Sequence, residues 1–141
     1  MDNIDIEKLL PHRGAMKLID EVIEINERHC VTVSTVSPRW PLYEDGHVDP
    51  IILVELAAQT AGINFGWHEM REGKGAAKQG WLVGIKRADF FCNKIPLGSA
   101  IVVTVEEQSK NGTYATISGT AQVGSDSVGR IELQVFRPEH A

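Results

Sequence analysis

Hydrophobic and polar residues alternate over several short stretches of this chain, which is the pattern of β-strands that bury one face. Near the N-terminus, Val31–Val36 alternates strictly, and the preceding stretch Ala15–Ile25 is strand-like although less regular. The polar residues 26–28 between them predict a β-hairpin. Ile4–Leu10 instead has the spacing of a short amphipathic helix that ends before Pro11.

The second half of the chain is almost entirely strand-like and is divided by turn residues. Asn111-Gly112 predicts a tight hairpin because this pair suits a type I′ turn. A second turn is expected at 124–127, where Gly, Ser and Asp cluster. The four strands predicted here are Trp81–Phe91, Ala100–Glu107, Tyr114–Val123 and Val128–Phe136.

One long apolar segment lies between the two groups of strands. Asp49 is suited to cap a helix, Pro50 is tolerated in its first turn, and the helical segment continues to about Met70. The segment is apolar on nearly every side, so we expect a buried helix. An antiparallel sheet wrapped round this helix is the simplest way to bury it. The sequence therefore predicts an α+β fold with the order strand, strand, long helix and four strands.

Composition and charge restrict the class of protein. A chain of 141 residues favours a single domain over 1–141. The formal net charge of −5 argues against general nucleic-acid binding, and no apolar stretch approaches the roughly 20 residues of a membrane span. The acidic N-terminus lacks the features of a signal peptide, and Cys30 and Cys92 match neither a disulfide framework nor a zinc site. We therefore expect a reduced, cytoplasmic protein without a bound metal.

Two polar residues on the apolar helix are the first candidates for chemistry. Glu55 and Gln59 are four residues apart and so share one face of the helix. A buried carboxyl group has to be neutral or paired, and a carboxyl held in that way can donate a proton. The alternative is a solvent-facing stripe on a partly exposed helix, which is the commoner situation for Glu and Gln.

Histidine is the usual general base near neutral pH. His47 lies just before the helix, after a glycine that gives the loop backbone freedom. His12 is a rival that could equally be a structural hydrogen-bonding residue. The sequence contains no His-Glu-x-x-His motif, no Gly-x-Ser-x-Gly motif and no glycine-rich phosphate loop. A serine nucleophile or a bound nucleotide is therefore not expected.

Positive charge is concentrated in one segment of the chain. Residues 71–94 hold six cations against two carboxylates, a local balance of +4 in a chain of −5. Such a segment can steer an acidic partner, although a solvated loop explains it equally well. The charged residues are Arg71, Glu72, Lys74, Lys78, Lys86, Arg87, Asp89 and Lys94.

Six short elements stand in one order along nearly the whole chain. They are Leu9–Arg13, Lys17–Val22, Gly46-His47, Glu55–Gln59, Leu82–Ile85 with Phe90, and Pro96–Gly98. Each element alone is weak, but together they resemble the β-hydroxyacyl-[acyl-carrier-protein] dehydratases of type II fatty acid synthesis. The likeness is greater to a shorter-loop branch, the 3-hydroxyacyl-carrier-protein dehydratases of aryl-polyene-type pathways.

The resemblance implies a hot-dog fold, in which an antiparallel sheet wraps round one long helix, and a dimer or larger assembly in which two sheets join side by side. It also implies a lyase reaction without a cofactor, the dehydration of a 3-hydroxyacyl thioester to the trans-2-enoyl thioester. An acidic acyl carrier protein or CoA would carry the acyl group. The acyl chain would lie in an apolar tunnel beside the helix and the strand that contains Val83 and Gly84.

The same resemblance assigns roles to individual residues. His47 would take the α-proton, and Glu55 of the other subunit would protonate or orient the departing hydroxyl. Gln59 would support Glu55 at the substrate. The N–H of Ile51 and the helix dipole would polarise the thioester carbonyl.

Two departures from the family pattern leave alternatives open. The stretch between His47 and the helix is several residues shorter than in the family. The family's glycine whose N–H faces the carbonyl aligns with Pro50, which has no N–H, so Ile51 would have to substitute. The alternatives are a non-catalytic helper subunit that forms a hetero-oligomer with another hot-dog subunit, and an acyl-thioester hydrolase that uses Glu55.

Overall fold

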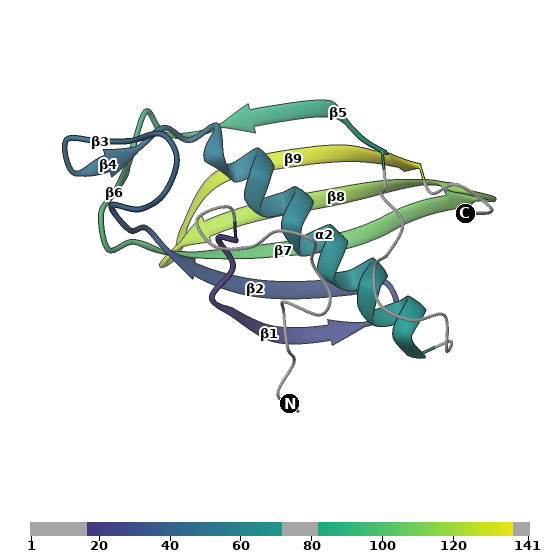
Figure 1. Ribbon diagram of the computed structural model, residues 1–141. Coiled ribbons are helices and arrows are strands. Elements are labelled where there is room, and N and C mark those ends of the chain that lie inside the picture. Colours follow the sequence, from purple (N-terminus) through teal and green to yellow (C-terminus); the bar gives the residue numbers. More distant parts are fainter. Residues whose placement is uncertain (1–16, 72–81, 137–141) are drawn as a thin grey trace.

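The computed structural model describes residues 17–71 and 82–136. Its main element is a six-stranded antiparallel sheet with the strand order β1-β2-β7-β8-β9-β5 (Figure 1). β5 joins β9 at the far side of the sheet, so β1 and β5 form its two edges. The strands are β1 (Glu21–Asn26), β2 (His29–Thr35), β5 (Leu82–Phe90), β7 (Ala100–Asn111), β8 (Tyr114–Val123) and β9 (Asp126–Phe136).

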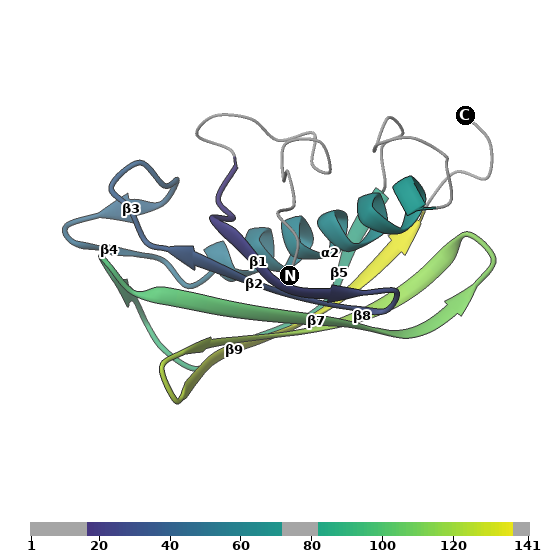
Figure 2. The same ribbon diagram turned by 90° about the horizontal axis from the view of Figure 1, so that it is seen from below.

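The helix α2 (Ile52–Arg71) runs diagonally across the concave side of this sheet (Figures 1 and 2). It packs against β2, β5, β7, β8 and β9, and Leu53, Leu56 and Ala57 are fully buried. This arrangement confirms the predicted α+β fold, with a sheet wrapped round one apolar helix. Within the described ranges, no helix combines the length and hydropathy that a membrane span requires.

Two glycines in the sheet allow α2 to approach closely. A Cβ placed on Gly129 of β9 would lie 2.6 Å from Leu53 Cδ1, which is closer than two carbons can pack. A Cβ on Gly119 of β8 would lie 3.5 Å from the Cβ of Ala57. The first half of α2 therefore packs closely on the sheet at two positions that have no side chain.

Polar side chains connect α2 to β2 along the other half of the interface. The Thr60 hydroxyl donates to the Leu56 carbonyl at 2.7 Å and lies 2.9 Å from the Thr32 hydroxyl, both side chains being buried. One turn later, Asn64 Nδ2 donates to the Asn26 carbonyl at 2.7 Å, at the turn between β1 and β2. These bonds satisfy polar groups that burial would otherwise penalise.

A second, three-stranded sheet lies beside the first turn of α2 (Figure 1). Each of its strands has two residues: β3 (Tyr43–Glu44), β4 (His47–Val48) and β6 (Ile95–Pro96). Asp45 and Gly46 join β3 to β4 with φ angles of 48° and 83°. Positive φ at both loop residues is the pattern of a type I′ turn. These strands are not predictable from the sequence, because two residues are too few to show alternation.

Several predicted elements are confirmed, with differences at their ends. Asp49 caps the helix as expected, since the Ile51 N–H donates to its Oδ1 at 2.9 Å. The hairpin at Gly112 is also confirmed, but its turn type was predicted wrongly. Its loop residues are Gly112 and Thr113, and only Gly112 has a positive φ, of 65°. That pattern belongs to a type II′ turn. The helix predicted over Ile4–Leu10 lies outside the described residues.

Candidate active site

Glu55 and Gln59 form a hydrogen-bonded pair on the first half of α2. Gln59 is 0% exposed and Glu55 is half-buried, so the pair is not a solvent-facing stripe. Gln59 Nε2 donates to Glu55 Oε2 at 2.9 Å, and Gln59 Oε1 accepts from the backbone N–H of Leu18 at 3.0 Å. Gln59 therefore contacts Glu55 directly, which is the geometry that a residue supporting this carboxyl group requires.

His47 is held at the first residue of β4, directly after the I′ turn. Its Nδ1 lies 3.3 Å from the carbonyl oxygen of Asp45, and the residue is half-buried. A proton on Nδ1 would donate to this carbonyl and leave a lone pair on Nε2. Across residues 17–71 and 82–136, no hydrogen bond or ion pair joins His47 to Glu55. The rival His12 lies outside the described residues.

The first turn of α2 offers few N–H groups to a ligand. The Ile51 N–H, expected to face the substrate, donates to the Asp49 carboxylate. The N–H groups of the next three residues donate to carbonyls of Asp49, Pro50 and Ile51 at 2.9–3.0 Å. A thioester carbonyl would have to displace the Asp49 carboxylate to reach Ile51. The side chain of Ile51 is 52% exposed beside this turn.

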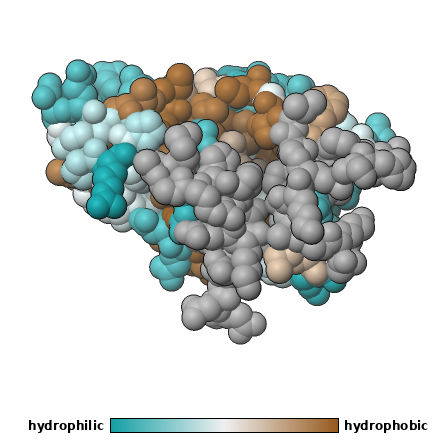
Figure 3. Space-filling model, viewed as in Figure 1, coloured by the Kyte–Doolittle hydropathy of each residue, from teal (hydrophilic) through white to brown (hydrophobic). Residues whose placement is uncertain are grey.

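The edge strand β5 presents an apolar face beside α2. Val83 and Ile85 pair with Val135 and Leu133, which are buried, so both side chains lie on the helix side of the sheet. They are 44% and 58% exposed, and Figure 3 shows hydrophobic side chains gathered over α2 and β5. Gly84 points to the opposite face, where a Cβ would lie 3.9 Å from Gln134 Oε1. Of the two residues expected beside an acyl chain, only Val83 has a side chain on that face.

The other reactive side chains lack the surroundings of a catalytic group. Burial raises the pKa of the Cys30 thiol to about 12 and also raises the pKa of Cys92, against a smaller opposing hydrogen bond with the Lys94 backbone. Neither thiol is therefore activated as a nucleophile. Among the described residues, no cluster of His, Cys, Asp or Glu side chains is arranged to hold a metal ion.

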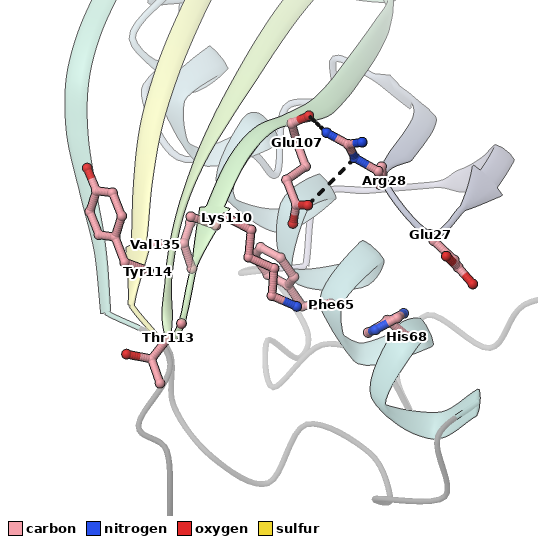
Figure 4. A pocket seen from close by; sticks show the side chains of 11 residues that line it. Glu27, Arg28, Phe65, His68, Glu107, Lys110, Thr113, Tyr114 and Val135 are labelled. Atoms are coloured by element: carbon pink, nitrogen blue, oxygen red, sulfur yellow. Dashed lines mark hydrogen bonds and ion pairs between the residues drawn. The ribbon is translucent and has the colours of Figure 1, made fainter.

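A pocket of about 190 Å³ lies at the other end of α2 (Figure 4). Phe65 and His68 of the helix face the β1–β2 turn and the β7–β8 hairpin there, and Arg28 forms an ion pair with Glu107 at 3.7 Å. Phe65 is ten residues from Glu55, about 15 Å along the helix axis. This pocket contains none of the predicted site residues.

The basic segment predicted over 71–94 is only partly described. Lys74 and Lys78 lie outside the described residues. Arg87 forms an ion pair with Asp89 at 2.8 Å, and the Arg71 guanidinium lies 4.7 Å from the centre of the Trp67 ring. Both arginines therefore have contacts within the chain.

Comparison with known proteins gives consistent matches over most of the chain. A sequence model of the ApeP-like family, described as ApeP dehydratase, matches residues 4–141. The 3-hydroxyacyl-[acyl-carrier-protein] dehydratase FabZ of Streptococcus pyogenes is 29% identical over 129 residues, which cover 87% of this chain and 88% of that protein.

Solved structures agree with the fold. The dehydratase heterocomplex ApeI:P from Xenorhabdus doucetiae superposes with a TM-score of 0.85 at 19% identity, over 99% of this chain and 94% of that one. A hypothetical thioesterase from Streptococcus pneumoniae, solved with coenzyme A, has a TM-score of 0.65 at 13% identity, over 84% of each chain. At these identities the likeness shows the fold alone, and it confirms the predicted hot-dog fold.

Proposed function

Because this chain belongs to the ApeP-like dehydratase family, we propose that it removes water from a 3-hydroxyacyl thioester and yields the trans-2-enoyl thioester. The C–H bond at the α-carbon and the C–O bond at the β-carbon break, the double bond forms, and the hydroxyl leaves as water. The reaction needs one base and one acid and no cofactor. The acyl group is carried by an acyl carrier protein or by CoA, and the cations around Lys86 favour an acidic carrier.

Glu55 is the proposed acid, and its bond to buried Gln59 is the observation that carries the proposal. Gln59 donates to Glu55 Oε2 at 2.9 Å, so a protonated carboxyl group keeps its proton on Oε1. In the proposal, this proton passes to the departing hydroxyl, which leaves as water. The edge strand β5 exposes the apolar side chains of Val83 and Ile85, a surface that suits an acyl chain.

His47 is the proposed base. With Nδ1 donating to the Asp45 carbonyl, Nε2 carries the lone pair that takes the α-proton. The proposal pairs His47 of one subunit with Glu55 of another, as the family resemblance implies. Two chains would meet at their β5 edges, whose apolar side chains are exposed in the single chain.

One observation favours a second candidate, in which this chain works only beside a different hot-dog subunit. Pro50 has no N–H, and the Ile51 N–H is already bonded to Asp49. A partner chain would then supply the group that polarises the thioester carbonyl, while this chain supplies Glu55. The neighbour from Xenorhabdus doucetiae is itself described as a dehydratase heterocomplex, which agrees with this candidate.

Absorbance at the enoyl-thioester band, recorded with a short 3-hydroxyacyl thioester, tests the function. We expect reversible loss of water, no activity in Glu55→Gln, and a fall of at least about 10²-fold in His47→Ala, the usual scale for a general base. Glu69→Gln and His68→Ala, near the other end of α2, are the matched controls and should keep full activity.

Other outcomes decide between the candidates. Activity only after another hot-dog dehydratase subunit is added would favour the second candidate. Release of free thiol without loss of water would identify an acyl-thioester hydrolase. A Glu55→Gln protein that melts earlier but keeps its rate would make Glu55 structural, and a fully active His47→Ala would move attention to His12.

A further inference from the structure

We propose that Asp20, an exposed residue just before β1, positions the Glu55 carboxyl group through Leu18 and Gln59. The inference rests on the proposed function, because it concerns the residue assigned as the acid. It assigns a positioning role, since Asp20 acts on Glu55 only through two intermediate residues.

The orientation of the Gln59 side chain is fixed by the Leu18 backbone. A backbone N–H can only donate, so the amide oxygen Oε1 has to face Leu18, and the donating Nε2 has to face Glu55. If the Leu18 N–H moved away, the buried amide could turn over and present its oxygen, in place of its donor, to the Glu55 carboxyl group. Whether Gln59 donates a hydrogen bond to Glu55 therefore depends on the position of the Leu18 backbone.

Asp20 fixes that place by two hydrogen bonds to β2. Its backbone N–H donates to the Val33 carbonyl at 3.1 Å, and its carboxylate Oδ2 accepts from the Thr35 N–H at 2.8 Å. The β1–β2 pairing begins at Glu21 and Val33. The bond from Thr35 to the Asp20 carboxylate adds one hydrogen bond between the two segments beyond this first pair. This bond holds residues 18–20, which precede β1, against β2.

The burial pattern agrees with this role. The side chains of Leu18 and Ile19 are 2% and 1% exposed, whereas Asp20 itself is exposed. A carboxylate at the surface is well solvated without a partner, so its bond to Thr35 contributes little to overall stability. Its effect is instead to keep the Leu18 N–H within 3.0 Å of Gln59.

Kinetic constants of Asp20 variants, measured in whichever assembly of the wild type dehydrates the thioester, test the proposal. Asp20→Ala should lower kcat by about 10-fold to 10²-fold, the scale for a small displacement of a catalytic group, and change KM by less than about twofold. Asp20→Asn should restore kcat to near wild type, because its Oδ1 also accepts from Thr35. Glu21→Ala, which removes the neighbouring exposed carboxylate, should leave kcat unchanged.

A double variant separates positioning from a general structural effect. In Gln59→Met, which keeps the size but loses both hydrogen bonds, adding Asp20→Ala should cause no further loss of kcat. If Gln59→Met does not fold, the test is hydrogen exchange at the Leu18 amide. Exchange there should be faster in Asp20→Ala than in the wild type. A wild-type rate in Asp20→Ala, or an Asp20→Asn variant as slow as Asp20→Ala, would overturn the inference. A wild type that does not dehydrate in any assembly would instead overturn the proposed function, and this inference with it.

Discussion

At the scale of single residues, the contact between Gly129 and Leu53 limits how closely α2 can lie on the sheet. Leu53 is completely buried, and the carbonyl oxygen of Asp89 also lies near the glycine, 3.3 Å from the position of a Cβ. A side chain at this position therefore has little room to be accommodated. The absence of a side chain at Gly129 therefore allows the helix that carries Glu55 to pack this closely on the sheet.

Gly129→Ala is expected to lower the free energy of unfolding by about 1–3 kcal/mol, because the added methyl group overpacks the core. Urea unfolding followed by circular dichroism measures the change. Gly84→Ala is the matched control on the neighbouring strand, since its nearest atom beyond the adjacent residues is 3.9 Å away. Equal stability of the two variants would contradict the tight contact.

A sequence can indicate a hydrogen bond made by a side chain, but it gives little indication of one made by a backbone group. The pairing of Glu55 and Gln59 could be predicted from the sequence, because polar residues four apart on an apolar helix are conspicuous. The Leu18 N–H was missed, since a backbone donor leaves no trace in the identity of its residue. The Ile51 N–H was predicted to face substrate, but it donates instead to the side chain of Asp49, the residue predicted as the helix cap.

At the scale of elements, α2 and β2 are joined by a chain of hydroxyl groups. Thr60 uses its single proton on the Leu56 carbonyl, so the Thr32 hydroxyl has to be the donor between the two threonines. Both side chains are fully buried. The bond fixes the position of the helix along β2 in a way that apolar contacts, which have no direction, cannot.

Thr60→Val should lower the free energy of unfolding by about 1–3 kcal/mol, because it leaves the buried Thr32 hydroxyl without an acceptor. Adding Thr32→Val should recover part of this loss, with a coupling of about 0.5–3 kcal/mol in a double-mutant cycle. Urea unfolding of the two single variants and the double variant gives the coupling. Strict additivity would show that the two hydroxyl groups do not interact.

The long elements could be predicted and the short ones could not. α2 and the strands of the large sheet each extend over enough residues for their periodicity to appear. β3, β4 and β6 have two residues each, and their pairing depends on the chain returning from Ile95 to His47, which no local pattern indicates. The position of His47 on a strand was therefore not foreseen, although the freedom of the Gly46 backbone was.

At the scale of the whole molecule, the two edges of the large sheet differ. β1 is a short edge strand, whereas β5 has nine residues and exposes Val83, Ile85 and Phe90. An exposed apolar edge of this length favours pairing with another chain. The sequence predicted an assembly only through the family resemblance, because which strand forms an edge depends on the complete topology.

Ile85→Lys should prevent this pairing, because a charged side chain would have to be buried at the joined edges. Sedimentation velocity should then report a single chain where the wild type is a dimer or a mixed oligomer. Ile23→Lys on β1, at the opposite edge, is the matched control, since Ile23 is 45% exposed and Ile85 is 58% exposed. A dimer that survives Ile85→Lys would contradict an interface at β5.

The β5 edge also has a consequence for handling the protein. A strand with free backbone groups and apolar side chains can add to any similar strand, including one from a partly unfolded copy. Lys86 in its middle places a charge on the strand that discourages such stacking, whereas the charge of Arg87 is paired with Asp89. The protein is therefore expected to aggregate more readily at high salt, where repulsion between Lys86 side chains of stacked strands is screened.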